Sequence, residues 1–275
     1  MSTSENVSKE RREWLKQQKR QKLGINLSKI GIFVLFIALW EFSARIGLID
    51  TFIMSSPSKV WGVICRLAST GELFTHIAVT SAEVVAGFVI GTVLGVFIAS
   101  LLWFSPFWCK VLEPYLVVFG SLPKIALGPI FIVWVGAGAE AIILITVTIS
   151  LVVTIMEVLN GFMATDEDKI KLVRSFGGSK MQIFSKIVLP SNFATVISSF
   201  KVSVSMSWVG VIVGEFLVSK AGLGYLIVYG SQVFQLDLVM ANVFILALLA
   251  TFMYLFIVWI ENIFIKKGLT DGGNR

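Results

Sequence analysis

Charged residues are scarce in this sequence. Only 15% of the 275 residues are Asp, Glu, Lys or Arg, whereas 56% are apolar and the mean hydropathy is +0.86. A soluble domain needs far more charge to cover its surface, so this composition excludes a soluble globular protein and indicates a membrane protein.

Residues that carry catalysis or bind metals are also few. The one His, His76, has no cluster of Cys, Asp or Glu at metal-ligand spacing, and no Ser has a plausible triad. The two Cys, Cys65 and Cys109, fall on opposite faces of the membrane in the topology derived below, so we expect no disulfide. We therefore predict neither a metal site nor an enzyme.

A nucleotide-binding loop is missing as well. The pattern G-x-x-x-x-G-K-[ST], whose backbone amides cradle phosphates, does not occur. The stretch "GGSK" at 177–180 lacks both the upstream glycine and the Lys-Ser/Thr pair. The chain is therefore predicted to bind no ATP and to need no cofactor of its own.

Six long apolar segments are present, and each suffices for one helical span of roughly 20 residues. We predict an all-α integral membrane protein with six transmembrane helices in one domain, residues 30–267, followed by a short C-terminal tail, 268–275. The predicted spans are about 30–48, 77–104, 114–135, 141–163, 193–218 and 240–265.

The first 29 residues are polar and carry eight Lys or Arg. They are not a cleavable signal peptide, because the following apolar run is too long and no small-residue cleavage site follows it. Two interpretations stay open: a flexible positive anchor, or an amphipathic helix on the anionic membrane surface around Trp14 and Leu15.

Basic residues near span ends stay on the cytoplasmic side. With the N-terminus inside, the inner segments hold 17 of the 23 Lys and Arg and the outer segments hold four. We therefore predict a multi-pass protein of a prokaryotic cytoplasmic membrane with both termini in the cytoplasm. The net charge of +6 follows from this rule and indicates no nucleic-acid partner.

Small residues and prolines mark two spans. Gly87, Gly91, Gly95 and Ala99 recur every four residues, which lets another helix approach closely. The stretch "SLPKIALGPIFIVWVG" contains Pro123, so a kinked or interrupted helix is expected there. Lys124 lies in the same stretch, and it either faces a cavity in the bundle interior or reaches the inner interface.

The fifth span carries Lys201, Trp208 and, near its outer end, Glu215. We expect Lys201 to reach the headgroups, whereas Pro123, Lys124, Trp208 and Glu215 are the candidates for the path. Glu215 is expected above all to form a salt bridge with Lys220. The glycine- and aromatic-rich segment 215–237 is predicted to be a partly helical element on the outer face, with an ordered connector as the alternative.

The inner loop 164–190 has strong helix signals. Thr165 or Asp166 can cap a helix with an acidic first turn, which Gly177-Gly178 ends with a left-handed cap. Ser179 with Gln182 predicts a capping box for a second helix, and Leu189-Pro190 is expected to stop that helix at the membrane. Three apolar residues of the first helix fall on one predicted face, namely Leu172, Val173 and Phe176.

This loop resembles the cytoplasmic signature of binding-protein-dependent ABC transporter permeases, E-A-A-x-x-x-G-x(9)-I-x-L-P. Gly177, Ile187, Leu189 and Pro190 match the pattern, whereas Lys171-Leu172-Val173 replaces the E-A-A. The stretches "SSPSKVW", "SLPKIALGPIFIVWVGAG" and "VGEFLVSKAGLGYLI" are similar to the nitrate, sulfonate and taurine branch, and the resemblance covers about 240 residues.

The resemblance implies that the loop, with Asp166, Leu172, Val173, Phe176, Gly177, Leu189 and Pro190, is a coupling helix. It also implies two copies of a cytoplasmic ATPase that bind ATP and Mg, a second copy of the permease in a homodimer, and an extracytoplasmic solute-binding protein. Membrane lipid is the remaining partner.

The resemblance implies a small solute, most simply an aliphatic sulfonate, taurine or a similar anion. Thiamine-precursor pyrimidines and riboflavin-like compounds are alternatives within the same class. A secondary transporter is disfavoured because neither internal symmetry nor intramembrane acids for ion coupling are found. A membrane enzyme is disfavoured because it needs a polar catalytic cluster.

Overall fold

The structure, a computed structural model, describes residues 9–271, and all regular elements in that range are helical. The predicted all-α class is confirmed. The elements are α1 (Lys9–Arg45), α2 (Thr51–Met54), α3 (Pro57–Thr70), α4 (Glu72–Phe104), α5 (Pro106–Ser121), η1 (Lys124–Leu127), α6 (Gly128–Val135), α7 (Ala139–Met163), α8 (Glu167–Ser175), α9 (Lys180–Ile183), η2 (Phe184–Val188), α10 (Leu189–Ser191), α11 (Phe193–Val218), α12 (Leu223–Gln232) and α13 (Leu236–Asp271).

Five helices of the described range are long and apolar enough to cross a membrane: α1, α4, α7, α11 and α13. A sixth crossing exists only as a bent pair, in which α5 and the η1–α6 segment meet at 87°. Pro123 follows the end of α5 and begins this break, and Pro129 lies in the first turn of α6. The predicted interruption of the third span is confirmed.

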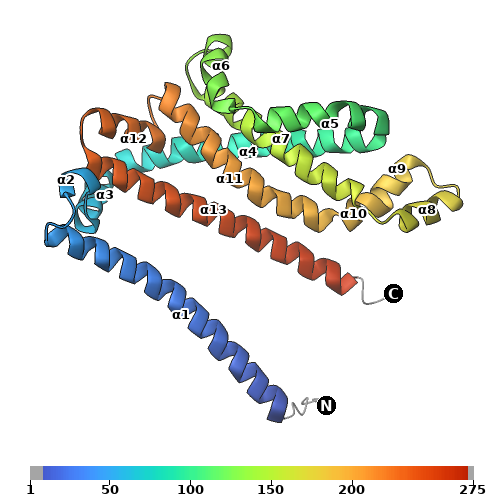
Figure 1. Cartoon of the computed structure of the whole chain (residues 1–275), viewed down its shortest axis with the longest axis horizontal. Coiled ribbons are helices and arrows are strands. Elements are labelled where there is room, and N and C mark those ends of the chain that lie inside the picture. Colours follow the sequence, from blue (N-terminus) through green and yellow to red (C-terminus); the bar gives the residue numbers. More distant parts are fainter. Residues whose placement is uncertain (1–8, 272–275) are drawn as a thin grey trace.

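Helix α1 diverges from the other helices toward its N-terminal end (Figure 1), whereas its second half reaches α13, where Phe33 stacks on Phe244 with ring centroids 6.5 Å apart. The boundary predicted at residue 29 falls inside this helix, which continues without a break from Lys9 to Arg45. Near its C-terminal end Glu41 accepts a hydrogen bond from Arg45, 2.7 Å, and one from the Ser58 amide, 3.1 Å. These contacts attach α1 to the first turn of α3.

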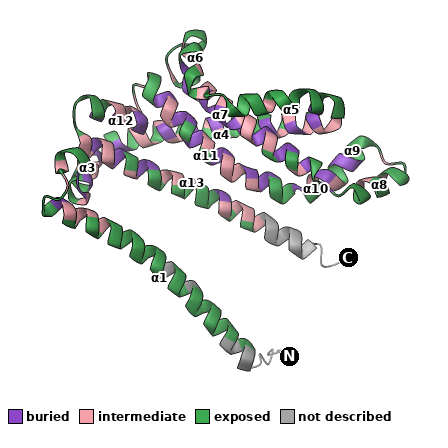
Figure 2. Cartoon of the chain, viewed as in Figure 1, coloured by how far each residue is buried: buried purple, intermediate pink, exposed green. Residues whose placement is uncertain are grey.

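The centre of the molecule is formed by α4, α7 and α11, which carry much of the buried surface (Figure 2). Helix α7 lies between the other two at very short range. A Cβ atom on Gly95 of α4 would come within 2.7 Å of Thr154, and one on Gly210 of α11 within 2.6 Å of the Thr146 Cα. The close approach predicted from the glycine repeat is confirmed, and it extends to α11.

The hydroxyl groups of this interface are satisfied within the helices. Thr146, Ser150 and Thr154 donate to carbonyl oxygens four residues earlier, at 2.7–3.0 Å. Thr154 also exchanges a hydrogen bond with Ser203 of α11, 2.7 Å. Because these three hydroxyls have partners, their side chains are accommodated in the close interface between the helices.

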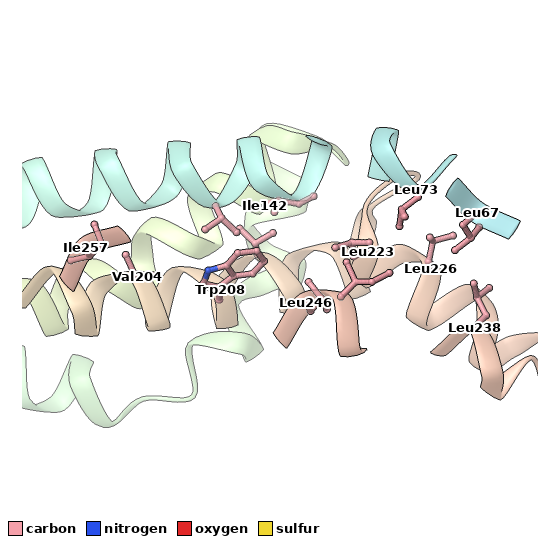
Figure 3. Packing of buried hydrophobic residues seen from close by; sticks show 13 residues of the cluster. Leu67, Leu73, Ile142, Val204, Trp208, Leu223, Leu226, Leu238, Leu246 and Ile257 are labelled. Atoms are coloured by element: carbon pink, nitrogen blue, oxygen red, sulfur yellow. The ribbon is translucent and has the colours of Figure 1, made fainter. Parts of the chain in front are cut away.

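Two apolar clusters lie in the bundle, and the first extends from α3 and α12 as far as Val204 and Ile257. One cluster joins α3, α4, α11, α12 and α13 and includes Leu67, Leu223 and Trp208 (Figure 3). The other joins the end of α4, α7 and the 183–188 segment and includes Phe162 and Phe184. In Figure 1, α8 and α9 project at the end toward which α1 begins and α13 finishes, whereas α2, α3 and α12 lie at the other end.

Candidate functional site: a capped loop and an outer polar junction

The loop between α7 and α11 begins with a capped helix, α8. Its N-cap is Asp166, whose carboxylate accepts from the Asp168 amide at 2.9 Å, so Asp166 rather than Thr165 is the cap. Glu167 and Asp168 then place negative charge in the first turn, where the helix dipole favours it. Nine residues thus form a defined helix on the surface of the protein.

The turn from α8 to α9 is also held by local bonds. Gly177 has φ +76°, a conformation that glycine adopts without strain, and the Gly178 amide donates to the Val173 carbonyl at 3.0 Å. The Ser179–Gln182 capping box is present: the Ser179 amide donates to Gln182 Oε1 at 2.8 Å, and the Gln182 amide to Ser179 Oγ at 3.3 Å. Both predictions are confirmed.

The apolar residues of α8 do not share one face, and this part of the prediction is wrong. Val173 and Ile170 pack on the apolar cluster that contains Phe162 and Phe184. Val173 also lies against Gly178. Leu172 and Phe176, one helical turn apart, point outward and are 57% and 82% exposed. The exposed apolar tip of the loop is therefore Leu172 and Phe176, and Met181 of α9 adds a third exposed side chain.

Leu189-Pro190 does not stop the second helix of the loop, which is a second correction. The chain passes from α9 through a π-turn, η2, where the Leu189 amide donates to the Phe184 carbonyl. Pro190 has no N–H with which to continue the regular ladder, so the turn before it widens. The helical path ends two residues later, at Asn192.

Asn192 closes the base of the loop, a role that no sequence pattern indicated. Its side-chain amide donates to Thr165 Oγ1 at 2.6 Å and to the Val188 carbonyl at 2.9 Å. Thr165 in turn donates to the Phe162 carbonyl at the end of α7, 2.9 Å. Since both side chains are buried, the two ends of the loop are joined where they enter the bundle.

Aromatic side chains anchor the same base. Phe184 lies between Phe162 of α7 and Trp103 and Phe104 of α4, with ring centroids 5.0–5.4 Å apart. Lys180 reaches the Phe104 carbonyl at 3.5 Å. The base of the loop is thus packed against α4 and α7, whereas most residues of α8 and of the turn that follows it are exposed.

The path candidates of the third span lie at its break. Pro123 is exposed, and Lys124 is partly exposed and donates to the Gly120 carbonyl at 3.0 Å. The ammonium therefore satisfies a carbonyl that the interrupted helix leaves without its normal partner. This geometry is compatible with both earlier interpretations of Lys124.

Trp208 lies in the outer apolar cluster beside Ile142 and is 6% exposed (Figure 3). Its indole Nε1 is buried and has no hydrogen-bond partner among the described residues. The ring borders a cavity of 330 Å³ between α11, α4 and α13, which is lined otherwise by Ser81, Val85, Leu249, Phe252, Met253 and Phe256.

Glu215 is 1% exposed and forms the centre of a polar junction at the end of the bundle that carries α3 and α12. Its carboxylate accepts from Thr80 Oγ1 of α4 at 2.6 Å and from the Gly224 amide of α12 at 2.5 Å. The predicted salt bridge with Lys220 is wrong, because Lys220 is exposed and pairs with no acid among the described residues. The helical element predicted within 215–237 is present as α12.

Lys201 also differs from its expectation. It forms an ion pair with Glu261 of α13, 2.9 Å, and both side chains are mostly buried. The structure does not bring the path candidates into one cluster: no hydrogen bond or ion pair among residues 9–271 joins Lys124 to Trp208 or Glu215. They lie separately along the bundle.

Residues 91–267 match the family model described as "Binding-protein-dependent transport system inner membrane component". A probable ABC transporter permease of Haemophilus influenzae is 29% identical over 87% of this chain and 97% of its own length. A putative aliphatic sulfonates transport permease of Bacillus subtilis is 26% identical, covering 84% and 83%. A formylaminopyrimidine transport permease of Halalkalibacterium halodurans is 29% identical, covering 84% and 92%.

The fold agrees with this relationship. A chain of the MetNI methionine ABC transporter, solved in an inward-facing conformation, superposes with a TM-score of 0.61 at 18% identity, covering 71% of this chain and 95% of that one. The helices and the family match define a multi-pass transport subunit of an inner membrane. The chain belongs to the binding-protein-dependent transport permeases and is the permease subunit of an ABC importer.

Proposed function

We propose that the α8–α9 segment is the surface through which this permease receives force from a cytoplasmic ATPase. The observation that carries the proposal is the 82% exposure of Phe176 next to Leu172 on a short capped helix. An apolar pair displayed this openly on a polar, basic loop indicates a protein partner. Two ATPase copies, each with ATP and Mg, would serve two copies of the permease.

The base of the loop supports transmission of that force. The bond from Asn192 to Thr165 and the aromatic contacts of Phe184 leave little freedom between the loop and helices α4, α7 and α11. A displacement of the tip would therefore tilt these helices as one body, which is the kind of rigid motion that alternates access. Ionic contacts are minor, since the Lys171 pairs with Glu167 and Asp168 are exposed.

The same geometry supports an orientation with both termini in the cytoplasm. Helix α1 begins and α13 finishes toward the end of the molecule that carries α8 and α9 (Figure 1). An ATPase docked at that end places α3, α12 and the polar junction outside, where an extracytoplasmic binding protein would deliver the solute. The boundaries at residues 29 and 267 remain part of this proposal.

For the solute, we infer a small aliphatic sulfonate, taurine or a similar anion, with a formylaminopyrimidine as the second candidate. One observation favours the second candidate. Lys201 is neutralised by Glu261, so only Lys124 of the two lysines predicted within the spans could attract an anionic solute. The pyrimidine permease is also as similar to this chain as the probable permease of Haemophilus influenzae.

The test is solute uptake by the assembled importer, isolated with its ATPase and binding protein and placed in liposomes that contain ATP. We expect uptake of a labelled aliphatic sulfonate, and a marked reduction of it by Lys124→Gln. The matched control is Lys220→Gln, which removes an exposed outer charge. If the importer takes up formylaminopyrimidine but no sulfonate, and Lys124→Gln does not change that uptake, the pyrimidine is the solute. If it takes up neither compound, both candidate solutes are rejected.

A further inference from the structure

Two carboxyl groups are buried against each other inside the membrane-spanning part of the molecule. Glu83 of α4 is 6% exposed and Glu215 of α11 is 1% exposed, and Glu83 lies one helical turn after Thr80, whose hydroxyl bonds to Glu215 at 2.6 Å. Two adjacent carboxylates cannot both keep a charge in such a place, because repulsion adds to the loss of hydration. One of the two groups must be neutral.

Glu215 is the one of the two groups whose surroundings stabilise a negative charge. Thr80 and the Gly224 amide donate one hydrogen bond to each of its oxygens. Gly224 lies in the first turn of α12, a ten-residue helix whose N-terminal amides favour a negative charge. A Cβ atom on Gly224 would come within 2.7 Å of the carboxylate, so the backbone is shaped closely around Glu215.

Glu83 has no comparable support. Its Oε2 atom is buried and receives no hydrogen bond from the part of the chain that the structure describes. His76, on the same helix, uses Nδ1 to accept from the Gly222 amide at 2.9 Å, so that nitrogen is not a donor. A neutral Glu83 solves the problem, because its O–H can donate to Glu215.

The other ionisable groups of the neighbouring elements do not change this balance. None of the ion pairs among the described residues involves Glu83 or Glu215. The surrounding basic side chains are exposed, namely Lys59 and Arg66 on α3 and Lys220 before α12. The remaining groups are acids or phenols, namely Glu72 on α4, Glu140 on α7, Tyr225 and Tyr229 on α12, and Asp237 on α13.

We propose that Glu83 and Glu215 bind a single proton between them, and that this proton latches the N-terminus of α12 to α4 and α11. Thr80 completes the latch, since its oxygen accepts from the Leu223 amide at 2.8 Å while its O–H is donated to Glu215. When the proton leaves to water, the two carboxylates repel and α12 loses its attachment. The outer end then opens more easily at high pH, whichever solute is carried.

The first test is infrared spectroscopy of the full-length chain in lipid nanodiscs. A buried carboxylic acid gives a C=O band that separates from ionised carboxylates and from the backbone. We expect this band at neutral pH in the wild-type protein and its loss in Glu83→Gln. The pH titration of this band in the wild-type protein tests the proposal even if Glu83→Gln does not fold. Absence of a protonated carboxyl band at neutral pH overturns the proposal.

The second test is hydrogen–deuterium exchange of the first turn of α12. At high pH these amides should exchange about tenfold or more faster in the wild type than in Glu83→Gln, because like charges at short range repel strongly. Comparison at equal pH removes the intrinsic pH dependence of exchange. Glu140→Gln, an exposed acid on α7, is the control and should behave as the wild type.

Two exchange results contradict the proposal. Equal protection of the wild type and Glu83→Gln at every pH would mean that the pair does not titrate while holding α12. Protection that depends on Na⁺ concentration, without a protonated carboxyl band, would mean that a metal cation occupies the place assigned to the proton.

Discussion

The two ends of the molecule are held by polar groups in different ways. At the inner end, the α8–α9 segment is shaped by bonds between residues two to five positions apart, such as the Ser179–Gln182 box. At the outer end, Thr80 bonds to groups 135 and 143 residues away, Glu215 and Leu223. A segment built locally keeps its shape when it moves, whereas a junction built from distant segments can open.

Exposure follows the same division. The inner segment displays Leu172 and Phe176, whereas the outer junction buries Glu83, Thr80 and Glu215. An exposed apolar tip suits a surface that grips a partner, and a buried acid pair suits a gate whose closure depends on its own chemistry. The comparison predicts that mutations at the inner end change coupling and that mutations at the outer end change the stability of the outer closure.

The largest effect is expected at the turn between α8 and α9. In Gly177→Pro the residue cannot keep φ +76°, so the angle between the two helices changes. We expect solute-stimulated ATP hydrolysis by the assembled importer to fall to its unstimulated rate, with normal insertion of the chain. Gly47→Pro is the matched control, because Gly47 has φ +74° at the outer end. Normal stimulation in Gly177→Pro contradicts the coupling role.

A smaller effect is expected at the base of the loop. Asn192→Ala removes two buried hydrogen bonds, to Thr165 and to the Val188 carbonyl, and should lower the free energy of unfolding by about 1–3 kcal/mol. Denaturant unfolding in micelles, followed by circular dichroism, measures this change. Coupling should weaken in parallel, since the tip is no longer joined firmly to α7. Loss of stability with unchanged coupling would separate the two roles.

Removal of a local cap should matter less. Ser179→Ala removes the hydroxyl half of the capping box and should cost about 1 kcal/mol, confined to α9. Amide exchange of residues 180–183 should accelerate while exchange in α7 and α11 stays unchanged. Accelerated exchange throughout the bundle would show that the loop is not an independent local unit.

The smallest effect is expected for Lys220→Gln. Lys220 is exposed and forms no ion pair among the described residues, so the free energy of unfolding should change by less than about 0.5 kcal/mol. Glu215→Gln, measured alongside it, should be clearly destabilising because Glu215 carries buried bonds to α4 and α12. Similar effects of the two substitutions would indicate that Lys220 and Glu215 form an ion pair after all, contrary to the structure.

Local signals in the sequence predicted much of this architecture. The Asp166 cap, the left-handed Gly177 and the break at Pro123 each depend on a few neighbouring residues, and each is confirmed. The glycine repeat on α4 predicted a close neighbour without naming it. Lys171-Leu172-Val173, where the sequence departs from the family signature, lie within α8.

Besides the apolar face of α8 and the helix stop at Leu189-Pro190, the errors concern contacts between distant segments. Closeness in sequence favours a pair of Glu215 with Lys220, but α12 folds back so that the Gly224 amide and Thr80 donate to the carboxylate instead. Lys201 pairs with Glu261, which is 60 residues away in the sequence, and Asn192 donates a hydrogen bond to Thr165 at the other end of the loop. No periodicity or spacing within one helix carries such pairings, because they depend on how the helices assemble.

The central claim is that the tip formed by Leu172 and Phe176 docks into the ATPase. Cysteine crosslinking in the assembled importer tests it most directly, in a background with Cys65→Ser and Cys109→Ala. We predict that Phe176→Cys and Leu172→Cys crosslink to cysteines lining the ATPase cleft, and that Arg174→Cys, exposed on the opposite side of α8, does not. Crosslinks of Phe176→Cys to a second permease copy alone, or equal crosslinking of Arg174→Cys, would contradict the account.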